Sequence, residues 1–276
     1  MNEALPRTEQ RNPASRGLGG LSAAAVIAVM NTEEQRVFTV VEQVTPLLAQ
    51  VAERVSAVFA GGGRTVFIGS GTSGRIALQE VAELPPTFGV SPDSFLVLAA
   101  GSPPSGPSTA IWAEDDEQAA PQALGALRIG SGDAVIGLAA SGTTPFVRAG
   151  VRAAARAGAW TCGIAHNPGA PLLADGELGI LLDTGPEVLT GSTRLKAGTA
   201  QKLALNRIST AAMVLAGRVA DNHMIELTGS NTKLRARAVR IVMDLAALDE
   251  QEARRRLEIT GWSVRAALQA GPQPRG

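Results

Sequence analysis

The fold is decided by one stretch, Thr65-Val66-Phe67-Ile68-Gly69-Ser70-Gly71-Thr72-Ser73-Gly74, in which an apolar run leads directly into a loop rich in glycine and serine. The apolar run is typical of a buried strand, and the residues after the loop have helical periodicity. The loop matches GxGxxG, but it lacks the lysine of a P-loop, and no acidic residue ends the next predicted strand to bind a ribose. The remaining interpretation is a strand-to-helix turn whose N–H groups and hydroxyls suit a monophosphate.

Four further apolar runs follow the first, with room for helices between most of them. They lie at residues 95–98, 134–138, 160–164 and 178–182, and helices are predicted near 73–83, 112–124 and 145–157. Strands that are apolar throughout and alternate with helices indicate a parallel sheet with both faces covered. The sequence therefore predicts an α/β fold, with a doubly wound, five-stranded parallel sheet flanked by helices.

Helical patterns lie on both sides of this α/β region. Residues 1–20 are polar and resemble an extended arm. A capping box at Asn31 and Glu34 then predicts one long helix that ends near residue 60. Beyond Thr193, the sequence predicts helices near 195–217, 231–247, 249–258 and 262–269. We therefore expect an arm and long helix at 1–60, an α/β domain at 61–220 and a small helical region at 221–276.

The composition narrows the chemistry that the chain can perform. Its 276 residues include 25 basic and 25 acidic side chains, one cysteine and two histidines, and 3% are aromatic. A single cysteine excludes a disulfide framework and a four-cysteine zinc site, and the zero net charge argues against a nucleic-acid surface. The longest apolar stretch, 21–30, is about half of the ~20 residues that span a membrane, and no secretory signal is apparent. We expect a soluble cytoplasmic protein whose chemistry uses carboxylates, hydroxyls and backbone amides.

A second loop of the same kind follows the third predicted strand, in the sequence Ala139-Ala140-Ser141-Gly142-Thr143-Thr144-Pro145. Thr144 is placed to cap a helix, and Pro145 suits its first position. Ligands of open α/β sheets bind at the carboxyl ends of the strands, where both loops are expected. The phosphate-binding residues predicted from the two loops are Gly71, Thr72, Ser73, Ser141, Gly142 and Thr143.

Three motifs resemble those of the N-acetylmuramic acid 6-phosphate etherase family, whose members are sugar-isomerase (SIS) domain proteins related to the glucokinase regulatory protein. The motifs are Gly71-Thr72-Ser73-Gly74-Arg75, the loop at 140–145, and Gly191-Ser192-Thr193-Arg194-Leu195-Lys196-Ala197-Gly198-Thr199-Ala200-Gln201-Lys202. The likeness begins at Thr8 and runs through Leu234, and the third motif is long and specific. The resemblance implies that residues 61–220 form an SIS-type sugar-phosphate-binding domain.

The resemblance also implies a reaction. It is the cleavage of the D-lactyl ether of N-acetylmuramic acid 6-phosphate to N-acetylglucosamine 6-phosphate and D-lactate, in peptidoglycan recycling, with no cofactor and no metal. Lactate would leave by elimination and water would then add, with the family's two catalytic carboxylates carried by Glu83 and Glu114. Two carboxyl groups with separated pKa values can exchange the required protons. Glu83 is expected where a helix ends before Pro85, and there the helix dipole favours the protonated form of a general acid.

Other candidates for contacts to the sugar or phosphate are Glu187, Ser192, Thr193 and Lys196. At ~1.5 Å of rise per residue, a helix places Glu83 roughly 14 Å from Gly74, which is beyond the reach from a sugar's 6-phosphate to its C3. Glu83 is therefore expected to serve a neighbouring subunit, in a homodimer whose active sites lie at or near the interface. No nucleic-acid or membrane partner is expected.

The chain departs from the family pattern near both glutamates. Leu84 stands where cysteine is usual, and Ile111 and Trp112 replace a Glu-Gly pair, which leaves the substrate range open. Two other functions also stay open, a non-catalytic sugar-phosphate-binding regulator and a sugar-phosphate isomerase, both on the SIS fold. The presence of both glutamates argues against the regulator. The shortage of histidine argues against the isomerase, whose ring opening is commonly histidine-assisted.

Overall fold

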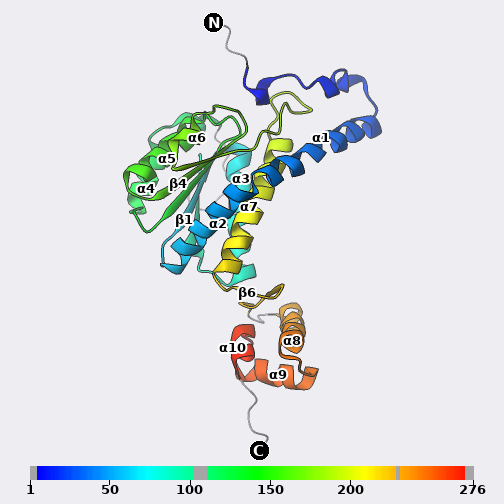
Figure 1. The fold of residues 1–276 in the computed structure, drawn as a ribbon, viewed down its shortest axis with the longest axis vertical. Coiled ribbons are helices and arrows are strands. Elements are labelled where there is room, and N and C mark those ends of the chain that lie inside the picture. Colours follow the sequence, from blue (N-terminus) through cyan, green and yellow to red (C-terminus); the bar gives the residue numbers. More distant parts are fainter. Residues whose placement is uncertain (1–4, 102–110, 228–230, 271–276) are drawn as a thin grey trace, which may run out of the picture.

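The computed structural model describes residues 5–101, 111–227 and 231–270. At its centre lies a parallel sheet, which confirms the predicted architecture (Figure 1). Its strands are β1 (Thr65–Gly69), β2 (Phe95–Ala99), β3 (Ala134–Leu138), β4 (Trp160–Ala165) and β5 (Leu178–Leu181), in the order β2-β1-β3-β4-β5. The register pairs Thr65 with Phe95 on one side and with Ala134 on the other.

Helices cover both faces of the sheet (Figure 1). One face carries α2 (Thr45–Ala60), α3 (Gly71–Phe88) and α7 (Lys196–Leu215), and the other carries α4 (Ala119–Ala126) and α5 (Pro145–Arg156). Successive strand residues serve opposite faces, so that Phe67 packs in the first hydrophobic cluster and Val66 in the second. Every residue of β1 is buried, which is why the run is apolar throughout. The shorter elements are η4 (Pro92–Ser94), η5 (Ile111–Asp115) and α6 (Leu172–Asp175).

Residues 31–60 form parts of two helices rather than the single helix that the sequence predicts. The first, α1 (Ala23–Gln43), begins after Ser22, whose hydroxyl accepts a hydrogen bond from the N–H of Ala25, so the capping box predicted at Asn31 does not form. The chain breaks before α2 because Pro46 has no N–H for the carbonyl of Glu42. The hydroxyl of Thr45 donates to that carbonyl instead, at 2.7 Å.

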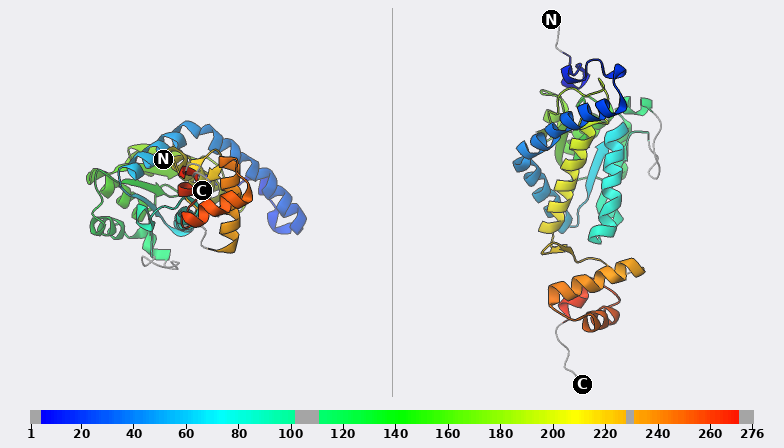
Figure 2. Two further views of the ribbon diagram at one scale, coloured as in Figure 1. Left: turned by 90° about the horizontal axis from the view of Figure 1, so that it is seen from below. Right: turned by 90° about the vertical axis from the view of Figure 1, so that its right-hand side faces the viewer.

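The first part of α1 projects beyond the body formed by the sheet and its covering helices (Figure 2). Before α1, the chain is not extended as predicted but forms three short 3₁₀ helices, η1 (Arg7–Glu9), η2 (Pro13–Ser15) and η3 (Leu18–Gly20). Figure 1 shows this N-terminal arm, residues 5–22, passing over the end of the sheet domain opposite the C-terminal helices. In the described part of the chain, no helix combines the length and apolar character needed to cross a bilayer.

The last helices lie at the opposite end of the molecule from the arm (Figure 2). They are α8 (Thr232–Ala246), α9 (Glu250–Ile259) and α10 (Val264–Gln269), and they follow a small hairpin of β6 (Val219–Ala220) and β7 (His223–Met224) that the sequence did not predict. These helices enclose a third hydrophobic cluster, in which Leu257 and Val264 are fully buried. Arg265 links them to the rest of the chain through the carboxylate of Glu226 and the carbonyl of Gly217.

Candidate active site

A cavity of about 320 Å³ lies at the carboxyl ends of β1 and β3. These two strands are neighbours in the sheet, and the chain leaves them in opposite directions, toward β2 from one and toward β4 from the other. Open α/β sheets bind their ligands at such a switch point. The residues that line the cavity are Thr8, Glu9, Ser70, Gly71, Thr72, Ser73, Glu114, Asp115, Leu138, Ala139, Ala140, Ser141, Thr143, Thr144, Pro145, Gly191 and Thr193.

The first glycine-serine loop leaves the N-terminus of α3 open. Ser70 occupies the N-cap position but makes no capping hydrogen bond, and its hydroxyl donates to Oε2 of Glu114 at 2.7 Å. The N–H groups of the first helical turn have no acceptor within the helix, so they are available to an anion in the cavity. The turn itself requires glycine, since a Cβ at Gly69 would lie 2.7 Å from the backbone nitrogen of Gly74.

The second loop is built in the same way. Thr144 precedes α5 but makes no side-chain capping bond, contrary to the prediction, whereas Pro145 does begin the helix. The hydroxyl of Ser141 accepts from the N–H of Thr143 at 3.2 Å. Gly142 shapes the loop without lining the cavity, because its φ is +71° and a Cβ there would lie 2.4 Å from that of Ala170. The cavity is thus bordered by two open helix N-termini and several hydroxyls.

The charged residues of the cavity wall are all acidic. Among the described lining residues there are three carboxylates, Glu9, Glu114 and Asp115, and no lysine, arginine or histidine. An anion in the cavity would therefore be held by N–H dipoles and hydroxyls, which is how helix N-termini bind phosphate groups. Within the described ranges, no cluster of three or more histidine, cysteine or acidic side chains is arranged to hold a metal ion.

The structure separates the two glutamates that the resemblance makes catalytic. Glu114 lies on η5 and lines the cavity, whereas Glu83 is exposed on α3 and does not line it. The prediction that this helix ends before Pro85 is wrong, because α3 continues through two prolines to Phe88, which is buried in the core. Glu83 therefore lies before the last turn. At this position it is out of reach of the charge at the helix C-terminus, whose effect fades within one turn.

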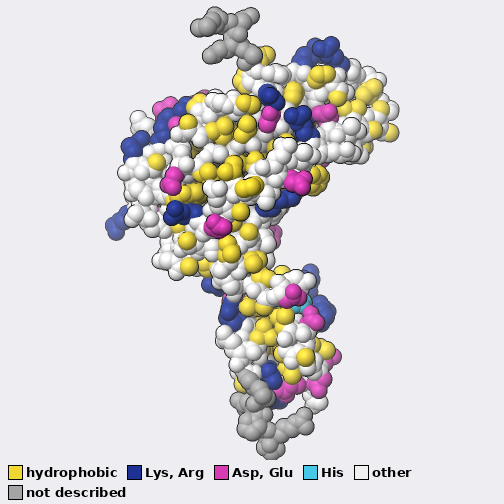
Figure 3. Space-filling view, in the orientation of Figure 1, with side chains coloured by type: hydrophobic (Ala, Val, Ile, Leu, Met, Phe, Trp, Pro, Cys, Tyr) yellow, Lys and Arg dark blue, Asp and Glu magenta, His cyan; other side chains and the backbone are white. Residues whose placement is uncertain are grey.

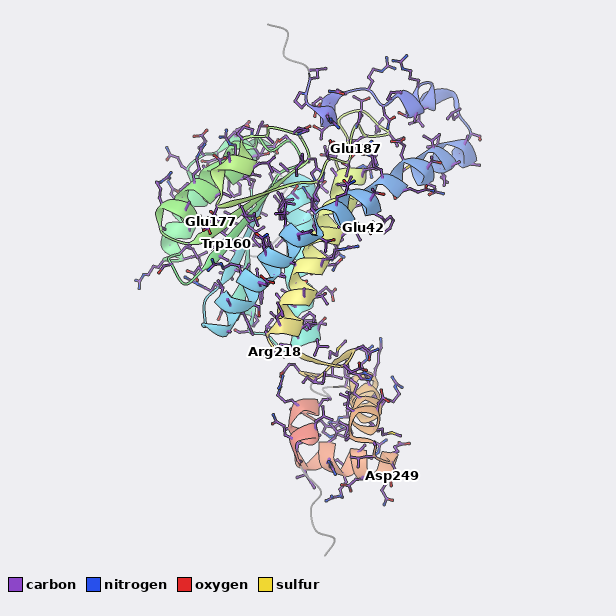
Figure 4. The ribbon with its side chains drawn as sticks, in the orientation of Figure 1. Glu42, Trp160, Glu177, Glu187, Arg218 and Asp249 are labelled. Carbon is purple, nitrogen blue, oxygen red and sulfur yellow. The ribbon has the colours of Figure 1, made fainter. Side chains whose placement is uncertain are left out.

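Two further candidates, Glu187 and Lys196, are buried and do not line the cavity. The carboxylate of Glu187 accepts hydrogen bonds from the backbone N–H groups of Lys196 and Ala197, at 3.1 and 2.9 Å, and so caps α7 (Figure 4). Burial raises the pKa of Glu187, although these hydrogen bonds oppose the shift. Lys196 donates to Oε2 of Glu33 at 2.7 Å. Of the neighbouring pair, Thr193 lines the cavity and Ser192 does not.

Sequence reasoning did not assign several residues that line the cavity, namely Thr8, Glu9, Ser70, Asp115, Thr144 and Gly191. The family likeness begins at Thr8, and this could have indicated that the arm residues Thr8 and Glu9 belong to the site. Among the departures from the family pattern, Leu84 is buried in the core between α3 and the sheet. The side chains of Ile111 and Trp112 lie outside the described part of the structure.

Comparisons with solved structures indicate the fold. The chain is similar to phosphoheptose isomerase GmhA from Neisseria gonorrhoeae, with a TM-score of 0.55 and 17% identity, over 69% of this chain and 99% of that one. It is also similar to a phosphoheptose isomerase from Francisella tularensis, with a TM-score of 0.50 and 15% identity, over 70% and 98% of the two chains. At this level of identity, the likeness establishes a shared SIS-type architecture.

Comparisons with curated proteins identify closer relatives, although no family model matches the chain. The N-acetylmuramic acid 6-phosphate etherase of Serratia proteamaculans (strain 568) is 40% identical over 97% of this chain and 90% of its own length. The protein of the same name from Deinococcus radiodurans is 42% identical over 95% of this chain and 86% of its own length. This chain belongs to the N-acetylmuramic acid 6-phosphate etherase family.

Proposed function

We propose that the protein is a carbon-oxygen lyase that cleaves the D-lactyl ether of N-acetylmuramic acid 6-phosphate, yielding N-acetylglucosamine 6-phosphate and D-lactate. One observation carries the proposal beyond the family name: a single cavity brings two uncapped helix N-termini together with the carboxylate of Glu114. The helix N-termini suit the phosphate, and the carboxylate suits a proton transfer. We place the reaction in the cytoplasm, as part of peptidoglycan recycling.

The site residues divide into two groups by the chemistry that they offer. The residues that would hold the phosphate are Gly71, Thr72, Ser73, Ser141 and Thr143 of the two loops, together with Thr193. Gly142, Glu187, Ser192 and Lys196 would support the site from behind, since none of them lines the cavity. Glu114 and Glu83 would exchange the protons of the reaction.

The reaction has two stages that need a proton acceptor and a proton donor. In the first, a carboxylate takes the proton from C2 and a carboxylic acid protonates the ether oxygen on C3. The C3–O bond then breaks, a C2–C3 double bond forms, and lactate leaves. In the second stage, water adds to C3 and a proton returns to C2. Ser70 donates to Oε2 of Glu114, and we assign the proton transfer to the other oxygen, Oε1.

We also propose that the protein is a homodimer whose partner chain completes each active site with its Glu83. Within one chain, Glu83 is exposed and outside the cavity, as an exchanged residue would be. Hydrophobic side chains are exposed along α1, including Ile27 at 56% and Phe38 at 61%, and Figure 3 shows hydrophobic side chains over this part of the surface. Such exposed apolar side chains are available to an interface between subunits.

The decisive experiment is to incubate the purified protein with N-acetylmuramic acid 6-phosphate and measure D-lactate. Release of stoichiometric lactate is expected, and Glu114→Gln should reduce the rate by roughly 10²- to 10⁴-fold, the usual range for a general acid or base. Binding without lactate would favour the regulator. Conversion of an aldose 6-phosphate into a ketose 6-phosphate would favour the isomerase.

The shared site is tested by mixing two inactive variants, Glu83→Ala and Ser73→Ala. If Glu83 acts on the partner's cavity, each mixed dimer contains one cavity with both native residues, and activity returns on mixing. Folded parents that stay inactive after subunit exchange would contradict the shared site. Exchange itself can be followed by mass spectrometry of the intact dimers.

A further inference from the structure

The N-terminal arm is fixed to the cavity wall by an asparagine. Thr8 is 1% exposed, and its backbone N–H donates to Oδ1 of Asn167 at 3.1 Å. The amide Nδ2 of Asn167 donates in turn to the hydroxyl of Thr8 and to the carbonyl of Ser141, both at 3.1 Å. The arm is thus attached directly to the second glycine-serine loop.

A second attachment lies further along the arm. The amide of Asn12 donates to Oε2 of Glu33 at 2.6 Å and to the carbonyl of Pro186 at 3.0 Å. The same oxygen of Glu33 accepts from Lys196, whose side chain is 1% exposed. Buried charges are retained only when they are paired and hydrogen-bonded, so this cluster fixes the position of the arm strongly. The two attachments lie on either side of Glu9.

Glu9 is held at the cavity with its carboxylate unused. Its side chain is exposed and lines the cavity, and a Cβ added to Gly191, which also lines the cavity, would lie 3.2 Å from its Oε2. Among the described residues, no hydrogen bond or ion pair of this carboxylate is found. We propose that Glu9 is a specificity-determining residue that accepts a hydrogen bond from a neutral O–H or N–H donor of the bound sugar. This inference rests on the proposed function, because it takes a sugar phosphate as the ligand.

The chemistry of the wall decides what Glu9 recognises. An ionised carboxylate is an acceptor only, and it repels the phosphate, so the phosphate belongs at the open ends of α3 and α5. The sugar itself then faces Glu9, and it carries hydroxyls and, in an N-acetylated sugar, an amide N–H. A hydrogen bond to an ionised acceptor is roughly twice as strong as a neutral one, so Glu9 selects ligands that present a donor at that position.

Calorimetry on the full chain tests this assignment with three probes: N-acetylglucosamine 6-phosphate, 2-deoxyglucose 6-phosphate and inorganic phosphate. Glu9→Ala should weaken the binding of N-acetylglucosamine 6-phosphate about tenfold and leave inorganic phosphate unchanged. Glu9→Gln keeps an acceptor oxygen and should recover part of the affinity. The matched control is Glu258→Ala, which removes an exposed glutamate on α9, remote from the cavity. In the lyase assay, Glu9→Ala should raise KM and leave kcat nearly unchanged.

The two possible donors give different results. If the donor is the amide N–H at C2, Glu9→Ala leaves the affinity for 2-deoxyglucose 6-phosphate unchanged. If the donor is a hydroxyl that both sugars carry, the affinity for 2-deoxyglucose 6-phosphate falls as well. An unchanged affinity for N-acetylglucosamine 6-phosphate would overturn the assignment. So would an equal loss for inorganic phosphate, which would indicate that Glu9 only supports the loops. Wild-type protein that binds the sugar phosphates but releases no lactate would contradict the proposed lyase function alone.

Discussion

The hydroxyl of Ser70 donates to Glu114 and makes no capping hydrogen bond to α3. The helix N-terminus therefore stays available for an anion. The hydrogen bond to Glu114 also fixes the orientation of the only predicted catalytic carboxylate that lines the cavity within one chain. We infer that Ser70 is a positioning residue for Glu114.

The substitution Ser70→Ala should therefore lower kcat about tenfold, because Glu114 loses the donor that orients it. The measurement is a double-mutant cycle with Glu114→Gln. If Ser70 acts through Glu114, the double variant is no slower than Glu114→Gln alone. If the two reductions in kcat multiply in the double variant, Ser70 acts separately from Glu114, for example on the phosphate.

His166 follows β4 and is 1% exposed, and among the described residues its Nε2 has no hydrogen-bond partner. Burial lowers its pKa from 6.5 to about 4, although a backbone hydrogen bond at Leu182 opposes the shift. The unfolded chain therefore binds a proton in the range between these two values while the folded chain does not. As a result, the stability contributed by neutral His166 is lost as the pH falls through this range.

Urea denaturation should thus show a decrease of about 2 kcal/mol in the free energy of unfolding between pH ~7.5 and pH ~5. The variant His166→Asn should lose most of this pH dependence of the free energy of unfolding, because asparagine does not titrate. An equal pH dependence in the two proteins would show that another group is responsible.

At the residue scale, the sequence predicted which residue types lie near the cavity better than it predicted which way each side chain points. Gly71, Thr72 and Ser73 could be placed at the cavity because the loops after parallel strands lie at one edge of the sheet. Lys196 lies in the motif at 191–202 and Glu187 shortly before it, yet both side chains are buried and neither lines the cavity. For Lys196 the packing of α1 against α7 decides this, because its partner Glu33 lies on α1, and no local pattern encodes that contact.

At the scale of elements, the contact between α1 and α7 contains an unequal ion pair. Lys196 on α7 is 1% exposed and Glu33 on α1 is 21% exposed. Burial alone would raise the pKa of Glu33, but the hydrogen bonds from Lys196 and Asn12 lower it below its ordinary value. The buried ammonium depends on its partner more than the carboxylate does, because water can still reach Glu33.

Glu33→Ala should consequently destabilise the protein by about 3 kcal/mol, since it leaves an unpaired charge inside. Lys196→Met should cost less, because the orphaned carboxylate can be hydrated and the methionine fills the space. Chemical denaturation of both variants gives the comparison. A larger loss for Lys196→Met would contradict this account of the pair.

The strands of the sheet were predictable because burial on both faces makes them apolar throughout, a signal that needs no partner to be identified. The helix boundaries were less predictable. Pro46 breaks a helix, whereas Pro85 and Pro86 do not. The reason is tertiary packing, because Leu84 and Phe88, at 2% and 7% exposure, are buried in the core and stabilise the last turns of α3. Proline alone therefore predicts a boundary only where packing does not oppose it.

At the scale of the whole molecule, the described hydrophobic residues form three clusters, of which two sandwich the sheet and the third belongs to the C-terminal helices. We propose on this basis that residues 221–276 are a separate unit, and that 61–220, covered by helices of 1–60, form the catalytic unit. No described residue of the third cluster lines the cavity.

If residues 221–276 are a separate unit, a substitution that destabilises the third cluster should leave the sheet domain unaffected. Leu257→Ala, at a fully buried position, should destabilise the C-terminal unit by roughly 2 to 5 kcal/mol and leave sugar-phosphate affinity within about twofold. Hydrogen exchange should show lost protection confined to α8, α9 and α10. Lost protection that extends into the sheet would indicate one cooperative unit.

The arm has a consequence for how the chain is made. Asn12 leaves the ribosome before its partner Pro186, and Glu33 leaves before Lys196, so the arm must wait for the whole sheet to emerge. At about 5–20 residues per second, synthesis of the intervening chain takes roughly 10–40 s. The segment that is translated early is thus among the last to dock, and the cavity that it lines forms only after the chain has been synthesised beyond Lys196.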